Sequence, residues 1–502
     1  MAAIFLLAFC FHLLGQYDVI VYRATPAGIS AAVTIHREGA KVLIIEPSHR
    51  PGGMMTNGLS ASDVCFTWVI GGFAREFFEK IGEKYGRRIG WRFEPKVAQM
   101  IFSAYLKDIP VKYSERIVKA NVSKKKLRSV VTNDGSTYSA NIFIDASYEG
   151  DLMALAGVTY RVGRESKHEY EESLAGFRIN SVRDQFPESL KARDTKNRLL
   201  SGVKKIEIPE TGSGDRGVMA YNYRLCVTRK RSNRVKFKRP KHYTRRSYEL
   251  LGEYIQKKPV TRIRELFHFL SIPNQKFDLN NFGPFSTNWV GHSWTYPEAS
   301  SEERRRIEIK HKLYTQGLLY FLSHDKAVPQ RIRRKIRIFG LCKDEFTDNN
   351  NWPSQIYVRV ARRLVGEYVM TQRDILKSRK FSDSIGLGSC PIESHSVQRF
   401  EAPDGTVKNE GAVFKLIRKP FSIPYRSIIP KKSELTNLLV PVALSATHIA
   451  YSAIRMEPTF MILGQSAGVA ATIAITDRVA IQDIDLSKLK RRLLELNQKL
   501  GY

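Results

Sequence analysis

A turn between a short apolar run and a helical stretch has the spacing of a dinucleotide-binding site. Such a site places the pyrophosphate on the N-terminal N–H groups of a helix, and glycine serves there because a Cβ atom would block the turn or the phosphate. Gly28 stands at the third glycine position, whereas Arg23 and Thr25 stand at the first two. Glu46 ends the next apolar run, where an acidic side chain accepts hydrogen bonds from the ribose. The candidate cofactor-binding residues of this unit are Thr25, Pro26, Ala27, Gly28 and Glu46.

Three further features point to FAD rather than NAD. A glycine pair follows Glu46 at the spacing of flavoproteins, an aspartate closes a later apolar run, and a helix of small residues opens near the C-terminus. A domain that binds only NAD has no use for that last helix. Each feature alone is compatible with ordinary helix–sheet packing, but their order along the chain predicts a split FAD-binding domain. The residues concerned are Gly52, Gly53, Asp145, Gly464 and Gln465.

Arg23 stands where a glycine is expected, and this puts the affinity for FAD in doubt rather than the fold. If the position requires a positive φ, a residue other than glycine costs on the order of 1 kcal/mol. The arginine side chain either crowds the pyrophosphate or pairs with it.

Two polar residues precede the last cofactor helix and are candidates for catalysis. The protein part of a flavin site positions the substrate over the flavin and supplies a base or an electrophile. We predict that His448 is a general base and that Arg455 holds an anion or stabilises flavin charge. The alternative is that His448 is a satisfied core histidine and that Arg455 forms a structural ion pair with Glu457.

Weaker candidates are interpreted first as packing or surface residues. They are Asp63, His395, Arg399 and Arg426. Asp344, Glu345 and Asp348 form an acidic cluster, but their spacing matches no metal-binding loop, so no metal site is predicted.

The elements that must position these residues form an α/β fold. A strand at 17–22, a helix at 29–38 and a strand at 41–45 make one βαβ unit, which predicts a Rossmann-like parallel sheet covered by helices on both faces. Charge, tyrosine and turn residues become more frequent from about 165 to 420. We therefore predict an FAD-binding domain in two parts, 17–164 and 421–502, with an inserted α+β substrate or cap domain at 165–420.

Composition excludes some classes of protein and leaves others open. The five cysteines include no C-x-x-C pair, which argues against a cysteine zinc site and against a redox dithiol; without Cys10, four remain that are either free or paired. The net charge of +32 would attract anionic glycans or other polyanions, although solvated basic faces are the simpler interpretation. No motif for specific nucleic-acid binding accompanies the charge.

Residues 1–16 are apolar and favour a cleaved signal peptide. The missing positive N-region leaves a misassigned start or an N-terminal extension as the alternative. A secreted or periplasmic location is therefore predicted, with a cytoplasmic one as the alternative, and no transmembrane segment is predicted.

The chain resembles the FAD-dependent oxidoreductase family, a group of largely uncharacterised and often secreted bacterial proteins, some of which carry the label xanthan lyase. The resemblance covers roughly residues 17–500 and rests on specific motifs. They include Ala24–Gly28, Gly52–Thr56, Trp91–Pro95, Phe143–Asp151, Gly283–Thr287, Lys343–Asp348, Ser445–Ala450, Arg455–Pro458 and Gly464–Gly468.

The resemblance implies a glutathione-reductase-type FAD domain with an inserted substrate domain, but no particular substrate. Two hypotheses follow. The first is a flavoenzyme that passes hydride between a small organic substrate and flavin N5. The second is a flavin-poor descendant that binds an anionic glycan or another polyanion, suggested by Arg23 and the net charge. No residue supports a polysaccharide lyase.

Overall fold

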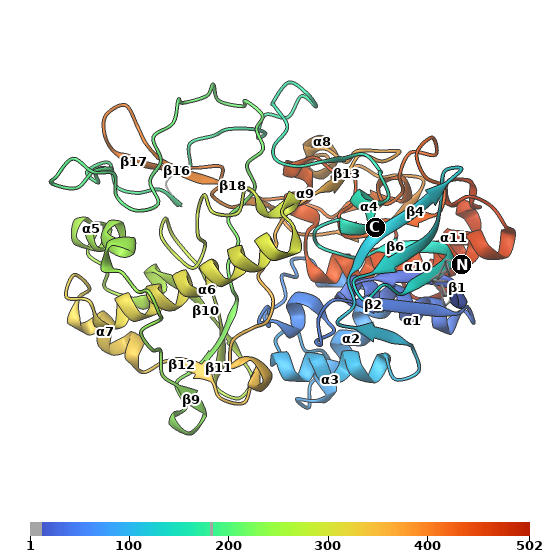
Figure 1. Ribbon diagram of the computed structural model, residues 1–502, viewed down its shortest axis with the longest axis horizontal. Coiled ribbons are helices and arrows are strands. Elements are labelled where there is room, and N and C mark those ends of the chain that lie inside the picture. Colours follow the sequence, from blue (N-terminus) through green and yellow to red (C-terminus); the bar gives the residue numbers. More distant parts are fainter. Residues whose placement is uncertain (1–12, 181–183, 502) are drawn as a thin grey trace, which may run out of the picture.

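The computed structural model describes residues 13–180 and 184–501 (Figure 1). Segments near the two ends of the chain lie together in one part of the molecule, whereas α5 (Glu249–Lys257), α6 (Ser301–His324) and α7 (Gln330–Arg337) lie in the other. The chain therefore leaves the first part, builds the second and returns.

The predicted βαβ unit is present. It consists of β1 (Leu13–Tyr22), α1 (Pro26–Arg37) and β2 (Val42–Glu46), and β1 pairs in parallel with β2 and with β6 (Thr137–Asp145). Val19 and Val21 belong to one hydrophobic core, whereas Ile20 and Tyr22 belong to another on the opposite face. Both faces of the strand are buried, as a parallel sheet between covering layers requires. The prediction of an α/β fold is confirmed.

The main sheet has the order β3-β2-β1-β6-β5-β4, with β20 paired to β6. Its parallel part brings the carboxyl ends of β1, β2 and β6 to one edge. The antiparallel part includes a hairpin of β5 and β6, with a turn at Asn133–Gly135 in which Gly135 has φ +89°. The strands not yet bounded are β3 (Val111–Tyr113), β4 (Ile117–Ser123), β5 (Lys126–Thr132) and β20 (Leu438–Leu439).

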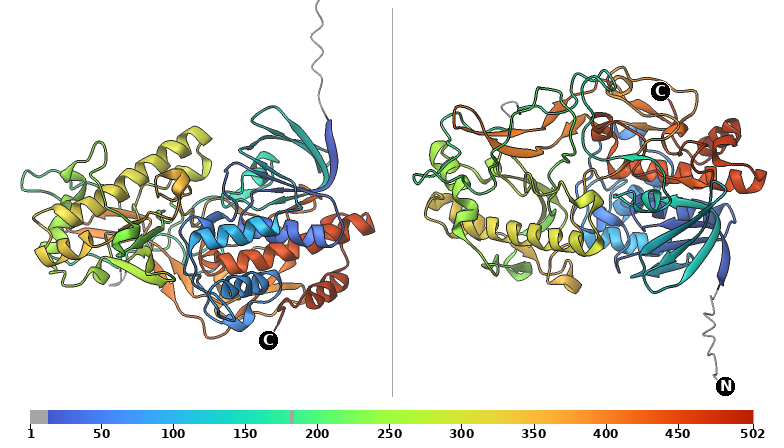
Figure 2. Two further views of the ribbon diagram at one scale, coloured as in Figure 1. Left: turned by 90° about the horizontal axis from the view of Figure 1, so that it is seen from below. Right: turned by 45° about the horizontal axis from the view of Figure 1, so that its top comes forward.

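Helix α10 (Glu457–Asp477) packs along α1, so the C-terminal segment completes the layer begun by the N-terminal one (Figure 2). A Cβ atom at Gly464 would lie 2.1 Å from the backbone carbonyl oxygen of Ala27. Ser30 Oγ donates to Met461 O at 2.7 Å. Glycine is needed here for close approach of two helices. The helix predicted to open at Gly464 in fact begins at Glu457, because Pro458 suits the first turn of a helix.

Three more helices belong to this part of the molecule. They are α2 (Gly72–Glu83), α3 (Pro95–Tyr105) and α11 (Leu486–Glu495). Helix α11 is amphipathic and buries Leu489 and Leu493.

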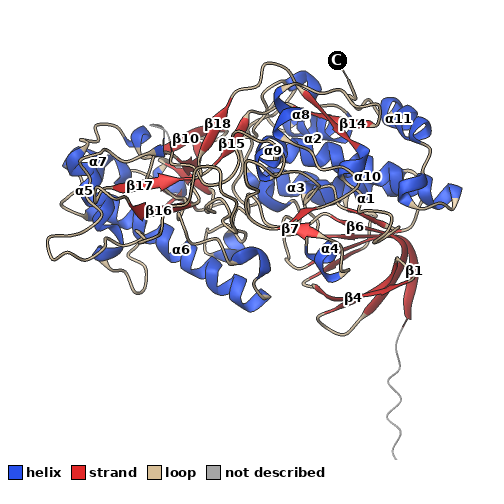
Figure 3. Ribbon diagram, turned by 90° about the horizontal axis from the view of Figure 1, so that it is seen from above, coloured by secondary structure: helices blue, strands red, loops and turns tan. Residues whose placement is uncertain are grey.

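A second sheet of five strands has the order β10-β11-β8-β12-β9 and is antiparallel in every pairing. Figure 3 shows β10 well away from β1 and β4 of the main sheet. The strands are β8 (Leu225–Thr228), β9 (Arg234–Val235), β10 (Phe267–Ile272), β11 (Lys276–Asn281) and β12 (Gly340–Cys342).

Outside the two larger sheets the chain also forms two-stranded ribbons and short helices. The ribbons are β7 (Tyr160–Arg161) with β13 (Arg363–Leu364), β14 (Ser384–Gly388) with β19 (Phe421–Pro424), β15 (Ile392–Ser394) with β18 (Val413–Lys415), and β16 (Gln398–Glu401) with β17 (Val407–Glu410). The helices are α4 (Asp151–Leu155), α8 (Gln372–Leu376) and α9 (His448–Ile454). The domain boundaries at 164/165 and 420/421 stay a prediction.

Most of the predicted signal peptide, residues 1–12, lies outside the described residues, and 13–16 begin β1. Within the described ranges one helix, α10, is apolar and long enough to cross a membrane by length and composition. Of its apolar window, 78% is buried inside the protein, as in the core helix of many folded domains.

Candidate functional site

The turn before α1 holds the N-terminus of that helix against the ends of β1 and β6. Thr25 caps the helix by accepting from Gly28 N at 3.2 Å, and its hydroxyl donates to Ala146 O at 2.8 Å. Pro26 and Ala27 form the first turn, where proline is favoured. A Cβ atom at Gly28 would lie 2.0 Å from Arg23 O, so only glycine fits. The arrangement presents a helix N-terminus, which attracts phosphate.

Arg23 has φ +78°, the left-handed conformation for which glycine is expected. For another residue this backbone costs roughly 1–2 kcal/mol. The guanidinium group lies between two carboxylates, with Nη1 3.5 Å from Glu46 and Nη2 3.5 Å from Glu149. The side chain is thus drawn toward acidic groups at the ends of β2 and β6, and its exposed fraction is 19%.

Glu46 ends β2 and fixes the neighbouring turns. One carboxylate oxygen accepts from Ala24 N at 2.7 Å and the other from Ser48 N at 2.8 Å. Because a carboxylate offers about four acceptor positions, both oxygens can still accept from a ribose.

The Gly52-Gly53 pair adopts the left-handed backbone, with φ +98° and +49°. Gly52 N donates to Ala24 O at 2.7 Å, which ties this loop to the α1 turn. A Cβ atom at Gly53 would lie 2.4 Å from the hydroxyl of Tyr148. The pair therefore brings the loop close to the segment that follows β6.

Asp145 directs its carboxylate into the chain rather than toward the turn. It accepts from Ser147 N at 3.0 Å and from Met153 N at 2.8 Å, and so shapes the path from β6 to α4. Burial raises the pKa of Asp145 to about 6, against the effect of these hydrogen bonds.

Gln465 lies on a different side from the α1 turn. Its side-chain oxygen accepts from Phe73 N at 2.6 Å at the start of α2. Gly464 contributes close helix packing, as described above. The structure therefore places Thr25, Gly28, Gly52 and Gly53 around one turn, with Gln465 apart from them.

A cavity of about 740 Å³ opens at the carboxyl edge of the main sheet. Its wall includes Arg23, Pro47 and Glu149, beside the turn, and continues to Arg304 and Arg362. Asp151 accepts from both of these last arginines, at 2.8–2.9 Å. The cavity is thus lined by both signs of charge.

A buried polar pair at the start of α10 was not predicted from the sequence. The hydroxyl of Tyr148 donates to Glu457 Oε1 at 2.6 Å and accepts from Met54 N at 3.1 Å. Glu457 Oε2 is buried without a hydrogen-bond partner in the described chain. Burial raises the pKa of Glu457 to about 8. The signal was available in Glu457-Pro458, because proline marks a first helical turn.

Arg455 caps the C-terminus of α9, two residues before α10 begins, and is 4% exposed. It donates to Tyr357 Oη at 3.2 Å and to Glu393 O at 2.7 Å, and its Nε is buried without a partner. The predicted alternative of an ion pair with Glu457 is not seen among the described residues. Arg455 is therefore a buried cation held by uncharged groups.

His448 begins α9 and is held by Glu165. The carboxylate lies 2.8 Å from His448 Nδ1 and also accepts from His448 N at 2.9 Å. Arg363 pairs with the other oxygen at 2.5 Å. Burial lowers the pKa of His448. Burial alone would raise the pKa of Glu165, but Arg363 and His448 hold it well below its usual value. This fixes the ring of a neutral histidine.

The structure does not bring the two predicted catalytic residues together. His448 is the first residue of α9 and Arg455 follows its last, so a rise of about 1.5 Å per residue separates their backbones by roughly 10 Å. They also contact different partners. Only Arg455 adjoins the Tyr148–Glu457 pair along the chain.

The acidic cluster surrounds a lysine. The ammonium group of Lys276 lies 2.6 Å from Glu94 and from Glu345 and 2.8 Å from Asp344. The place where a cation would bind is taken by this side chain. Asp348 lies elsewhere, 2.5 Å from Arg50.

Two weaker candidates have structural surroundings. Arg426 pairs with Asp383 at 2.9 Å, and Asp63 is exposed beside Cys65. His395 lies between β15 and β16, and Arg399 lines a separate pocket considered below.

A family model described as FAD dependent oxidoreductase matches residues 18–493. No curated protein matches the sequence. Among solved structures, the chain is similar to a flavin monooxygenase from Stenotrophomonas maltophilia, with 18% identity over 26% of this chain and 38% of that chain and a TM-score of 0.20. OxyS anhydrotetracycline hydroxylase from Streptomyces rimosus shares 11% identity over 34% of this chain and 42% of its own, with a TM-score of 0.26. The chain spans less than half the length of either structure.

The residues at the sheet edge fit an FAD molecule. Among the described residues, Arg23 Nε, Glu149 Oε2 and Glu457 Oε2 are buried without hydrogen-bond partners, and the residues of the first two line the cavity beside the α1 turn. Buried polar atoms are normally satisfied, so these atoms indicate a polar ligand. The α1 turn with Arg23 would hold the diphosphate, Glu46 the ribose, and the Gly52-Gly53 loop the flavin end.

Proposed function

We propose that this chain, which belongs to the FAD dependent oxidoreductase family, passes hydride between a small organic substrate and N5 of its FAD cofactor. A general flavin redox role follows from the family. When bound, FAD supplies the acceptor or donor of the hydride, and the chain supplies binding, orientation and proton transfer. The observation that carries the proposal is the buried Tyr148–Glu457 pair beside Arg455.

Glu457 is a proton carrier in this proposal. Its carboxyl group is buried and has a pKa of about 8, so it holds a proton at neutral pH. A catalytic acid or base works best when its pKa is near the working pH. Tyr148 fixes one oxygen at 2.6 Å and leaves Oε2 to exchange a proton with the substrate.

Arg455 holds a negatively charged or strongly polar substrate group. Its known partners are a phenol hydroxyl and a backbone carbonyl, so its charge is not neutralised by a carboxylate among the described residues. A buried cation of this kind favours an anion. The neighbouring Arg359 is also held by uncharged oxygens, of Ala220, Asn222 and Asn281, and burial lowers its pKa to about 9.

His448 is the competing candidate for the base, because Glu165 orients its ring as the acid of a catalytic dyad would. The two candidates predict different pH profiles. A base with a pKa of about 8 gives a rate that still rises above neutral pH, whereas His448 titrates below its usual value.

The first experiment is the absorbance spectrum of the purified chain. A flavin band near equimolar with protein supports the proposal, and colourless protein that fails to take up added FAD contradicts it. The second is anaerobic bleaching of that band by a panel of alcohols, amines and sugar acids. With a bleaching compound in hand, Glu457→Gln and His448→Asn are compared over the pH range. Loss of the alkaline limb in Glu457→Gln alone supports Glu457, and loss of rate in His448→Asn alone supports His448.

Binding of an anionic glycan or another polyanion through the basic surface remains a second proposal, favoured by the net charge of +32. Binding to an acidic polysaccharide that is lost in about 1 M salt, where the Debye length is about 3 Å, would support it. Secretion or a periplasmic location also remains a proposal, and fractionation of producing cells tests it.

A further inference from the structure

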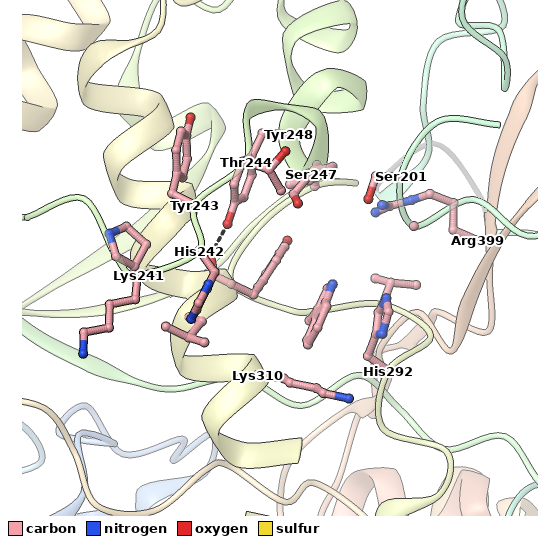
Figure 4. Close-up of a pocket in the computed structure, with 17 residues that line it drawn as sticks. Ser201, Lys241, His242, Tyr243, Thr244, Ser247, Tyr248, His292, Lys310 and Arg399 are labelled. Atoms are coloured by element: carbon pink, nitrogen blue, oxygen red, sulfur yellow. Dashed lines mark hydrogen bonds between the residues drawn. The ribbon is translucent and has the colours of Figure 1, made fainter. Parts of the chain in front are cut away.

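A second pocket, of about 250 Å³, lies away from the sheet edge, among α6, the segment before α5, the loop at 285–292 and β16 (Figure 4). It is smaller than the roughly 300–1,000 Å³ of pockets for drug-sized ligands. A ligand the size of one sugar ring fits it better than a cofactor does.

The charge of this pocket is uniformly positive. Lys241, Lys310 and Arg399 line it, and its wall contains no aspartate or glutamate. Arg399 is 5% exposed and lies between the rings of Phe186 and Phe285, each 5.0 Å from its guanidinium carbon. Buried cations are usually paired with a carboxylate, which suggests that the missing negative charge comes from a ligand.

The hydrogen bonds of Arg399 leave one nitrogen for that ligand. Nε donates to Asn409 Oδ1 at 2.9 Å and Nη2 donates to Pro284 O at 2.8 Å, both uncharged acceptors. Figure 4 shows the guanidinium group directed toward Ser201. Burial lowers the pKa of Arg399 to about 10, which still leaves it charged at neutral pH.

The indole ring of Trp289, which lines the pocket, is stacked against neighbouring rings on both of its faces. Trp289 stacks on Tyr314 with ring centres 5.0 Å apart and on His292 with ring centres 3.8 Å apart. A flat aromatic ligand therefore cannot stack there. The hydroxyls of Ser201, Thr244 and Ser247 line the same pocket and suit a ligand with hydroxyl groups.

We propose that this pocket binds a carboxylate-bearing monosaccharide unit, with the carboxylate on Arg399. The unit is either a free sugar acid or the end of an acidic glycan, since the recognised chemistry is the same. The proposal does not depend on the redox role, because none of these residues lines the cavity at the sheet edge.

Calorimetric titration of the full flavin-loaded chain with D-glucuronate tests the proposal, with D-glucose and sodium sulfate as the other probes. We expect saturable binding of glucuronate and at least tenfold weaker binding of the other two. Arg399→Met should weaken glucuronate binding at least tenfold, whereas Arg331→Met, which removes the same charge from an exposed position, should leave it unchanged. Equal binding of sulfate, or unchanged binding by Arg399→Met with a retained flavin spectrum, would overturn the proposal. An oligoglucuronate titration then separates the two sources: tighter binding than the monomer indicates a glycan end.

A separate observation concerns the cysteines. Those in the described part of the chain, Cys65, Cys226, Cys342 and Cys390, fall into two close pairs. In the first pair, Leu341 of β12 stands opposite Val227 of β8, and the antiparallel register places Cys342 opposite Cys226. Opposite residues on antiparallel strands have Cα atoms about 4.5–5.5 Å apart, within the range of disulfides. Their sulfur atoms are 3.3 Å apart.

The second pair joins segments far apart in the sequence. Cys65 lies in the loop before α2 and Cys390 follows β14, and their sulfur atoms are 2.9 Å apart. A bond needs about 2.05 Å, so a small rotation of either side chain closes the gap. Each cysteine thus has one partner within reach.

We propose that the chain carries two disulfides, Cys65–Cys390 and Cys226–Cys342, when it folds in an oxidising compartment. In each, two thiols lose two protons and two electrons as the S–S bond forms. A small-molecule disulfide such as oxidised glutathione accepts the electrons and becomes two thiols. Cys65 is exposed and starts the exchange at its own pair.

Non-reducing peptide mapping of the full chain, refolded with oxidised glutathione, tests this proposal. We expect the two stated cross-links and a mass lower by four hydrogens than that of the reduced chain. Cys65→Ser should lose only its own cross-link, and Cys226→Ser only the other. Alkylatable thiols at Cys65, Cys226, Cys342 and Cys390 after oxidation, or crossed pairs between the two sets, would overturn it.

Discussion

The cavity at the sheet edge and the second pocket, which Arg399 lines and which is called the aromatic pocket below, both contain buried arginines. The partners of these arginines differ between the two regions. At the sheet edge Arg304 and Arg362 both pair with Asp151. In the aromatic pocket Arg399 has only uncharged partners among the described residues. The first arrangement holds the fold together, and the second is left for a ligand to complete. Buried charge therefore separates a structural role from a binding role.

Asp151→Asn should give the largest effect. The carboxylate serves Arg304 and Arg362 at 2.8–2.9 Å, so its loss leaves two largely buried cations unpaired. We expect the free energy of unfolding to fall by about 4 kcal/mol, measured by urea denaturation.

The pH dependence of that effect provides its control. Arg304 and Arg362 lower the pKa of Asp151, although burial opposes them. The stabilisation is therefore present above the unfolded pKa of about 3.9 and is lost as the pH falls below it. A difference between variant and wild type that persists under acid would show that Asp151 acts by packing rather than by charge.

Glu457 sharpens the comparison because it is a buried acid without a cation. Its pKa is raised to about 8, so the folded chain keeps the proton while the unfolded chain loses it above about pH 4.3. Stability should fall as the pH rises through this window, by about 3 kcal/mol between about pH 5 and about pH 7.5. Glu457→Gln should lack this fall. If the stability of both proteins depended on pH in the same way, Glu457 would not have a raised pKa.

Arg23→Gly tests whether the arginine at the α1 turn assists the cofactor. Glycine relieves the backbone at φ +78°, but Glu46 and Glu149 then lack a counter-charge beside the diphosphate. We expect the variant to bind FAD roughly tenfold more weakly, which corresponds to about 1.4 kcal/mol. Equilibrium dialysis with detection by flavin fluorescence measures the dissociation constant. Arg23→Lys, which keeps the charge, should stay near wild type. Tighter binding by Arg23→Gly would mean that the arginine crowds the site.

Arg399→Met should give the smallest change in stability. No ion pair is broken, and only two hydrogen bonds to uncharged oxygens are lost. We expect the ligand-free protein to change by less than about 1 kcal/mol in urea denaturation. A loss of unfolding free energy as large as that of Asp151→Asn would show that Arg399 has a structural role like that of the arginines at the sheet edge.

The βαβ unit at the start of the chain could be predicted from the sequence, because the patterns that define it lie within a short stretch of residues. Strand, turn, helix and strand follow from apolar runs and glycine positions within about 30 residues. The positive φ of Arg23 agrees with the expectation attached to that position. The sequence predicts a helix that opens at Gly464, whereas α10 begins seven residues earlier, at Glu457, because Gly464 serves the close contact with α1 and not a helix start.

Side-chain partners across long sequence distances were not predictable. Glu165 lies 283 residues from His448, and Tyr148 lies 309 residues from Glu457. Only the folded topology brings them together, and nothing in the spacing of either residue indicates its partner. The sequence also did not show that a helix, α9, separates His448 from Arg455.

Because α10 packs on α1, the first helix of the chain is synthesised long before its packing partner. Ser30 and Met461, which share a hydrogen bond, are 431 positions apart. At about 5–20 residues per second, roughly 20–90 s pass between the appearance of the first and the second. During that interval the apolar face of α1 lacks its partner. A nascent chain is therefore most exposed to aggregation while its middle is being made, and shortening it by even the last helical segments should leave the first strands without a lasting fold.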